Sequence, residues 1–203
     1  MNIGLAVDGQ SERAAIPKLK NALESACPLR ILTPVFFQSN PEASPAALAK
    51  TCASRIEILK VQGAAEVVVL VDREGREVCP GEFAAEIAQH LATLVDVTVS
   101  VVVKNRMFEN WLIADVAALS AQPKRFAVSE GTRKAIEPNK ADNLDGIDIL
   151  KRCVIDGSYN KVEDSKKILA HADPRNIAKN SRSFRRFLRC LRHPDYVGQS
   201  QKP

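Results

Sequence analysis

The most constraining feature of this sequence is the run VVVLV at residues 67–71, which is almost entirely β-branched and contains no polar residue. Such a run is typical of a strand that is buried on both faces of a parallel sheet. The run ends on Asp72, with Glu74 two residues further on, and open α/β sheets carry their ligands at strand ends of this kind. A second apolar strand, predicted at residues 2–7, ends on Asp8. We expect the two strands to be neighbours that bring Asp8, Asp72 and Glu74 to one edge of the sheet.

Strands and helices are predicted to alternate along the first half of the chain. An edge strand interrupted by Pro34 is expected at residues 29–37, and a last strand at residues 95–103. Helices are expected at residues 12–25, 45–62, 83–94, 107–119, 146–154, 161–172 and 181–191, with mainly loop at residues 122–146. Ser11 is expected to cap the first helix and Pro17 to be tolerated in its first two turns. This order predicts an α/β fold with an open, mostly parallel sheet flanked by helices and a helical C-terminal extension.

Charge is distributed unevenly along the 203 residues. Residues 1–120 contain 11 basic and 14 acidic residues, a net charge of −3, whereas residues 121–203 contain 18 and 10, a net charge of +8. We therefore predict an α/β domain at residues 1–120 and a basic, mainly helical extension at residues 121–203 that packs on it. An acidic half followed by a basic half is consistent with a metal site beside a surface that binds a polyanion.

Several classes of protein are disfavoured by the sequence. No apolar run approaches the roughly 20 residues of a membrane span, and the N-terminus lacks the features of a signal peptide. The five cysteines are widely spread and never at CxxC spacing, so neither a disulfide framework nor a zinc site is indicated. Motifs of the P-loop, HExxH and GxSxG types are absent. We expect a cytoplasmic protein with reduced thiols and no membrane partner.

The acidic strand ends form a candidate metal site. Mg²⁺ and Mn²⁺ prefer oxygen ligands, often one or two carboxylates together with waters and phosphate oxygens. A metal held there can activate a water and stabilise the leaving oxygen of a phosphodiester. A single Asp after a strand is more often a turn former or a helix cap, so the joint pattern rather than any one residue favours a site.

Short motifs in the chain resemble known families. VDGQSE at residues 7–12 is similar to the EGxxE signature of Toprim domains, and VLVDREG at residues 69–75 is similar to their DxD strand end. Toprim is the metal-binding fold of topoisomerases, primases and overcoming-lysogenization-type nucleases. Three later segments resemble a bacterial Toprim-like family known as "domain of unknown function 4276": FENWLIAD at 108–115, SYNKVEDSKKIL at 158–169 and SFRRFLRCL at 183–191. Members of that family are often encoded beside an ATPase, so the resemblance implies an ATPase partner and a role in phage defence.

The resemblance implies roles for individual residues. Asp8 stands where Toprim enzymes carry a Glu that acts as general acid/base, and Asp72 and Glu74 stand at the DxD metal ligands. Asp8 is one methylene shorter than Glu and Glu74 is one longer than Asp, so the cluster either compensates or binds metal without cutting. Glu12 matches a second acidic position of the first motif, and it is equally explained as a first-turn Glu favoured by the helix dipole.

Two residues of the later segments extend the candidate site. Glu109 matches the family's ExW segment and is either a further metal ligand or part of the polar side of an amphipathic helix. Lys161 matches the family's YxK segment and is a candidate ligand for a phosphate or a transition state, although a lysine of this kind is more often simply exposed.

The last predicted helix is basic on one side and apolar on the other. We expect its apolar stripe to dock on the body of the protein and its arginines to contact a nucleic-acid backbone. A solvated helix whose arginines pair with acids elsewhere, or an acidic partner protein, is also compatible with the pattern. The arginines are Arg182, Arg185, Arg186, Arg189 and Arg192.

The sequence thus favours a Toprim-like nuclease that uses Mg²⁺ or Mn²⁺ to cleave DNA or RNA. The alternative is a catalytically inactive subunit that binds a partner ATPase, which the departures at Asp8 and Glu74 favour. A third hypothesis is a receiver-like module phosphorylated on Asp72, because Lys104 also ends a strand beside the acidic strand ends. The single Asp8, in place of an acidic pair, counts against this third hypothesis.

Overall fold

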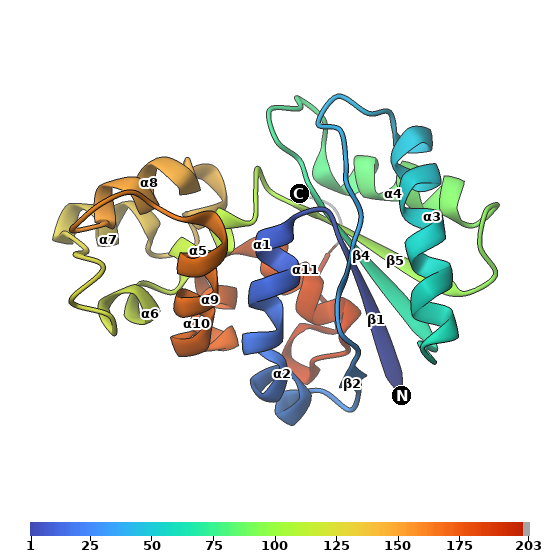
Figure 1. Ribbon diagram of the computed structural model, residues 1–203, viewed down its shortest axis with the longest axis horizontal. Helices are drawn as coiled ribbons and strands as arrows, with labels where there is room; N and C mark the ends of the chain where they lie inside the picture. Colours follow the sequence, from blue (N-terminus) through green and yellow to red (C-terminus); the bar gives the residue numbers. More distant parts are fainter. Residues whose placement is uncertain (201–203) are drawn as a thin grey trace.

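The computed structural model describes residues 1–200 (Figure 1). The strands are β1 Asn2–Val7, β2 Arg30–Ile31, β3 Val35–Phe36, β4 Glu66–Asp72 and β5 Thr98–Lys104. The α-helices are α1 Gln10–Ala15, α2 Lys20–Ala26, α3 Pro45–Val61, α4 Pro80–Leu91, α5 Glu109–Ala114, α6 Val116–Ser120, α7 Glu130–Ile136, α8 Gly146–Cys153, α9 Lys161–His171, α10 Pro174–Asn180 and α11 Arg182–Cys190. Short 3-10 helices are η1 Ile16–Lys18, η2 Ala141–Asn143 and η3 Pro194–Tyr196.

The strands form one five-stranded sheet in the order β2-β1-β4-β5, with β3 also paired to β1. All of these pairings are parallel. The register runs from Ile3 opposite Glu66 to Val7 opposite Leu70, and it reaches Asp72 opposite Lys104 between β4 and β5. The α/β fold with a mostly parallel sheet is therefore confirmed, and the two strands that end in aspartate are neighbours. The ends of β1, β4 and β5 lie along one edge.

Helices cover both faces of the sheet, because successive strand side chains alternate between two hydrophobic clusters. One cluster joins Val69 and Val101 of the strands to α3 and α4. The other joins Leu70 and Val102 to α1, α2 and the C-terminal helices. Figure 1 shows α3 and α4 on one side of the sheet, and the group α5 to α10 on the opposite side beyond α1. The run VVVLV is apolar at every position because each of its faces is buried.

Two predicted helices are divided in the structure. The helix expected at residues 12–25 becomes α1, η1 and α2, because Pro17 has no N–H to continue the α-helical hydrogen bonding. It also begins before Ser11, with Gly9 at its cap. The helix expected at residues 107–119 becomes α5 and α6, because Asp115 leaves the helical conformation and accepts a hydrogen bond from the Ala118 N–H. The strand around Pro34 similarly becomes the short β2 and β3.

Two α-helices of the described residues were not predicted from the sequence. The helix α7 lies in the segment expected to be mainly loop, and α10 lies in a segment for which no helix was expected. Both carry start signals, since Ser129 caps α7 and Asp173 followed by Pro174 begins α10. Each helix has only 7 residues, too few to give a clear apolar repeat.

The C-terminal region is helical and packs on the sheet domain. The helix α11 contacts β5, and α9 contacts α1. The proposed boundary between residues 120 and 121 stays a prediction, and residues 201–203 of the predicted extension lie outside the described residues. Within residues 1–200, none of the helices combines the length and the apolar character that crossing a bilayer requires.

Candidate metal centre

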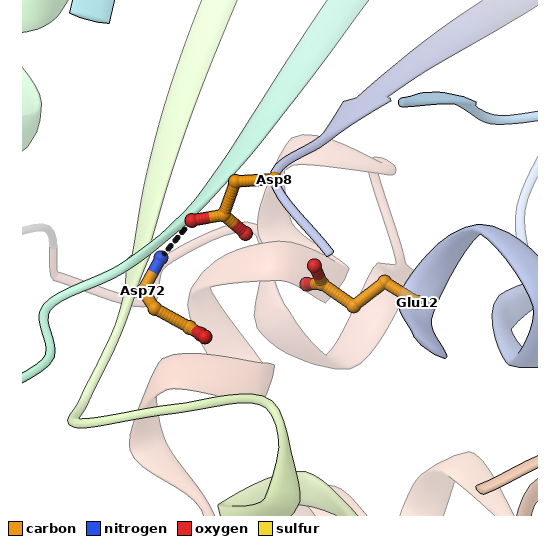
Figure 2. A group of neighbouring side chains, drawn as sticks. All are labelled: Asp8, Glu12 and Asp72. Atoms are coloured by element: carbon orange, nitrogen blue, oxygen red, sulfur yellow. Dashed lines mark hydrogen bonds between the residues drawn. The ribbon is translucent and has the colours of Figure 1, made fainter. Parts of the chain in front are cut away.

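Three carboxylates converge where the strands end. Asp8 directly follows β1, Asp72 is the last residue of β4, and Glu12 lies in the first turn of α1. One oxygen of each carboxylate lies within 4.8 Å of the others (Figure 2). The backbone N–H of Asp72 donates to Asp8 Oδ2 at 2.7 Å, which fixes the end of one strand against the next. The parallel register and the β1–α1 turn together produce this group.

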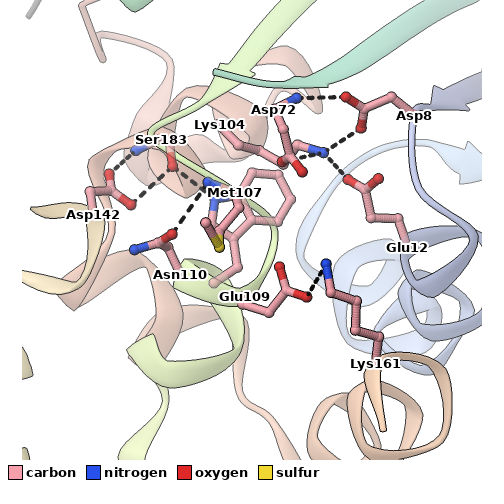
Figure 3. Close-up of polar contacts among 11 residues, drawn as sticks. Asp8, Glu12, Asp72, Lys104, Met107, Glu109, Asn110, Asp142, Lys161 and Ser183 are labelled. Atoms are coloured by element: carbon pink, nitrogen blue, oxygen red, sulfur yellow. Dashed lines mark hydrogen bonds and ion pairs between the residues drawn. The ribbon is translucent and has the colours of Figure 1, made fainter. Parts of the chain in front are cut away.

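Lys104, the last residue of β5, points its ammonium into the centre of this group (Figure 3). Its side chain is 0% exposed, and its Nζ lies 2.8 Å from Asp8 Oδ1 and 3.0 Å from Asp72 Oδ1. It also donates a hydrogen bond to Glu12. A buried ammonium is costly unless it is paired, and here three carboxylates surround it. Lys104 is therefore the counter-charge that the protein itself supplies to the acidic cluster.

Burial and neighbouring charges shift the pKa values of the ionisable groups in the cluster. Burial, together with the charge of Asp8, raises the pKa of Asp72 to about 8 against the opposing charge of Lys104. Burial likewise raises the pKa of Glu12 well above its usual value. Burial disfavours the ammonium of Lys104, but the surrounding carboxylates outweigh this penalty and raise its pKa. Without a metal, the charged form of Lys104 is thus favoured, whereas the raised pKa values of Glu12 and Asp72 favour their protonated forms more than in water.

The donor atoms fit a hard divalent cation. Among the described residues, Glu12 Oε2, Asp72 Oδ1 and Glu109 Oε1 are buried and have no hydrogen-bond partner. Asp72 Oδ1 lies near Lys104 Nζ, and Glu109 Oε1 lies 3.5 Å from Lys161 Nζ, but neither contact has hydrogen-bond geometry. Buried oxygens without partners are costly, and carboxylate oxygens are the ligands that Mg²⁺ and Mn²⁺ prefer.

The candidate site lies in a pocket of about 250 Å³. Besides the three converging acids, Glu74, Glu109 and Lys161 line this pocket. Glu109 begins α5 and is 2% exposed, whereas the Lys161 side chain at the start of α9 is 59% exposed. Burial and the charge of Asp8 raise the pKa of Glu74. All six predicted residues of the acidic site thus share one pocket, but only Asp8, Glu12 and Asp72 converge.

Comparison with family models gives one match over residues 7–192, described as domain of unknown function (DUF4276). The chain belongs to the DUF4276 family. The description names no activity, and comparisons with curated proteins and with solved structures give no match. The match covers every residue of the pocket and of the arginine-rich helix α11, so all of them lie in the DUF4276 domain.

The predicted arginines of this DUF4276 domain do not form a single exposed face. The apolar side of α11 is buried as expected, but Arg186 is also buried, at 4% exposed. Arg185 donates to the Ala178 carbonyl at 2.6 Å, and Arg192 pairs with Glu66 at the start of β4. Arg189 is half-buried. Arg182 and Arg186 line a second and larger cavity, of about 790 Å³, beside the acidic pocket.

A polar network ties the C-terminal helices to the pocket. The Asn110 amide donates to the carbonyls of Ala141 and Leu144 at 2.7 and 2.8 Å, one residue after Glu109. Asp142 accepts hydrogen bonds from the Ser181 hydroxyl and the Ser183 N–H at 2.7 and 2.8 Å (Figure 3 includes Asp142 and Ser183). The sequence did not reveal this network, because its members are far apart along the chain.

Lys104 and three arginines of this DUF4276 domain were also missed by sequence reasoning. Lys104 was considered only as part of a phosphoacceptor site, although its position at a strand end next to Asp72 is the signal that places it in the cluster. Arg73, Arg76 and Arg106 were not considered, although they follow the ends of β4 and β5. The rule that located the acids, that ligands bind at the carboxyl ends of parallel strands, would also have located these arginines.

Proposed function

We propose that this DUF4276 domain is a metal-dependent nuclease that hydrolyses phosphodiester bonds in DNA or RNA. The observation that carries the proposal is the convergence of Asp8 and Asp72, at the ends of adjacent strands, with Glu12 of α1, where Glu12 Oε2 is buried and has no hydrogen-bond partner among the described residues. The Toprim resemblance of the two N-terminal motifs supports the same chemistry, and the neighbouring arginine-lined cavity supplies positive charge for a polyanion.

Asp8 and Asp72 would hold Mg²⁺ or Mn²⁺, with Glu74 and Glu109 as further carboxylates in the same pocket and Glu12 beside them. When bound, the cation supplies Lewis-acid stabilisation of a phosphodiester oxygen and lowers the pKa of a water. The charged residues of the pocket then position the substrate. Lys161 is the exposed cation at the pocket and is suited to contact a non-bridging phosphate oxygen.

Among the three converging acids, Glu12 is the best suited to exchange a proton with the substrate. Its Oε2 has no partner among the described residues, and burial raises its pKa well above the usual value. Both oxygens of Asp8 already accept hydrogen bonds, from the Asp72 N–H and from Lys104. We therefore assign the acid/base role to Glu12, in place of the Asp8 that the resemblance implied.

The proposal is tested by incubating the purified protein with supercoiled plasmid and with total RNA, with Mg²⁺, with Mn²⁺ or with EDTA. Glu12→Gln and Asp72→Asn should each reduce cleavage by roughly 10²–10⁴-fold. Glu130→Gln, on the exposed side of α7, is the matched control and should cleave like the wild type. Cleavage that persists in EDTA, or in both pocket variants, would contradict the proposal.

The central position of Lys104 favours a second candidate function. Its ammonium lies among the carboxylates that would hold a cation, so it neutralises part of the cluster without any metal. In this case the protein is a catalytically inactive subunit that binds a partner ATPase, as the family resemblance implied. This candidate predicts no metal binding and co-purification of an ATPase with the tagged protein.

A further inference from the structure

A cavity of about 790 Å³, here called the basic basin, lies next to the acidic pocket. It is lined by the loops that follow β4 and β5, by the segment around η2 and by α11. Glu74 lines both the basin and the acidic pocket, so the two are neighbours. The arginines of the basin are Arg73, Arg76, Arg106, Arg182 and Arg186.

The positive charge of the basin exceeds its negative charge, because the described residues of its lining include five arginines and three carboxylates. Among the described residues, none of Arg73, Arg76, Arg106 and Arg186 forms an ion pair with a carboxylate. The Nε atoms of Arg73 and Arg76 are buried and have no hydrogen-bond partner. Arg186 is 4% exposed, and its Nε donates to the Ser200 carbonyl at 3.4 Å. Buried donors without partners are costly, and an anion in the basin would satisfy them.

Acidic residues in the basin wall cancel only part of this charge. Asp142 accepts hydrogen bonds from the Ser181 hydroxyl and from the N–H and hydroxyl of Ser183, but these neutral donors leave its negative charge in place, close enough to act on Arg186. Glu77 is exposed, and Glu74 lies where the basin meets the acidic pocket. The basin is therefore built to attract anions.

The basin is fixed relative to the acidic pocket by backbone hydrogen bonds. The Arg73 N–H donates to the Lys104 carbonyl at 3.1 Å, and the Glu74 N–H donates to the Arg106 carbonyl at 2.7 Å. These bonds continue the β4–β5 pairing beyond the strand ends. The chain therefore passes directly from the acids of the pocket to the arginines of the basin, with Arg73 next to Asp72.

The chemistry of the basin fits a phosphodiester backbone rather than a nucleobase. Among the described residues, its lining contains arginines and the asparagines Asn105, Asn139 and Asn143, but no aromatic ring on which a base could stack. Arginines recognise phosphate through paired hydrogen bonds, whereas binding of unpaired bases depends on aromatic platforms. We propose that the basic basin holds the backbone phosphates of a nucleic-acid strand that flank the phosphate in the acidic pocket. Recognition there is independent of base sequence.

This inference rests on the proposed function for the choice of ligand, but binding can be measured without cleavage. The probes are fluorescein-labelled single-stranded DNA and RNA oligonucleotides and the matching duplexes, with EDTA present, followed by fluorescence anisotropy at several salt concentrations. The basin variant is Arg73→Gln with Arg106→Gln, which removes two positive charges from the basin. The matched control is Arg30→Gln with Arg55→Gln, which removes two exposed charges elsewhere.

The basin variant should bind at least about tenfold more weakly than the wild type, with a salt slope smaller by about 1.4, because each phosphate contact contributes about 0.7 for a single strand. The control should bind within about threefold of the wild type, because exposed charges are screened. Thermal unfolding of both variants shows whether the fold is kept, and Arg76→Gln serves instead if the double variant unfolds.

The inference is overturned if the basin variant and the control bind equally well, or if the wild type binds no strand at low salt. If the wild type binds no strand, an acidic segment of a partner protein would become the expected ligand of the basin. Competition by a free mononucleotide as strong as that by a strand would also overturn it. Strand binding without cleavage in Mg²⁺ or Mn²⁺ would contradict the proposed nuclease and support the basin.

Discussion

At the scale of single residues, Lys104 controls how the acidic cluster behaves without a metal. Its buried ammonium contacts Asp8, Glu12 and Asp72, so removing it leaves three carboxylates with no counter-charge. Repulsion among buried carboxylates destabilises the folded state, and a divalent cation would relieve it. Substitution of Lys104 by an uncharged residue therefore distinguishes a site that binds metal from a purely structural salt bridge.

We expect Lys104→Met to lower the free energy of unfolding by about 3–5 kcal/mol in EDTA, because one partner of a buried ionic cluster is lost. Mn²⁺ should restore much of this loss, since binding to the folded state alone stabilises it. Thermal unfolding with and without Mn²⁺ measures both effects. Lys60→Met, which removes a surface ion pair with Asp96, is the control and should not respond to Mn²⁺. If Mn²⁺ does not restore the stability of Lys104→Met, the cluster is a structural salt bridge rather than a metal site.

At the scale of elements, the strand ends were predictable and the helix packing was not. Asp8 and Asp72 could be placed because apolar runs identify buried strands and parallel neighbours end at one edge. Glu12 remained undecided, because its helix begins at Gln10 and only the turn through Gly9 brings it to the cluster. Arg186 was expected on an exposed face, but its burial depends on how α11 docks against the sheet and η2. Such long-range packing has no local signal.

Close packing of α8 on α5 holds Glu109 in the pocket wall. A Cβ added at Gly146 would lie 2.8 Å from the Glu109 carbonyl carbon and from the Asn110 nitrogen, both of them backbone atoms. Gly146→Ala should therefore destabilise the protein by about 1–3 kcal/mol through overpacking. Urea unfolding measures this change.

Gly131→Ala is the matched control in α7, where the added Cβ meets only Ser129 Oγ at an ordinary 3.8 Å. That substitution should be stabilising by about 0.5–1 kcal/mol, because alanine loses less conformational entropy than glycine in a helix. If both variants have the same stability, α5 and α8 are not packed as described.

At the scale of the whole molecule, the acidic and basic parts of the chain are assembled around one sheet edge. The uneven charge along the sequence predicted a metal site beside a polyanion surface, and the structure places the acidic pocket and the basic basin side by side. Much of the basin charge nevertheless comes from Arg73, Arg76 and Arg106 of the first half rather than from the C-terminal extension alone. The charge of each half of the chain indicates that acidic and basic surfaces are present, whereas the fold determines which residues form them.

Calorimetric titration with Mn²⁺ at pH 6 and pH 8, on the wild type and on Asp72→Asn, tests the central claim most directly. The wild type should bind Mn²⁺, and more tightly at pH 8, because the metal-free pKa of Asp72 is about 8 and its proton must leave first. Asp72→Asn should lose most of the binding, whereas the exposed control Asp96→Asn should keep it. Absence of binding by the wild type at both pH values, or equal binding by Asp72→Asn, would contradict a metal centre at these strand ends.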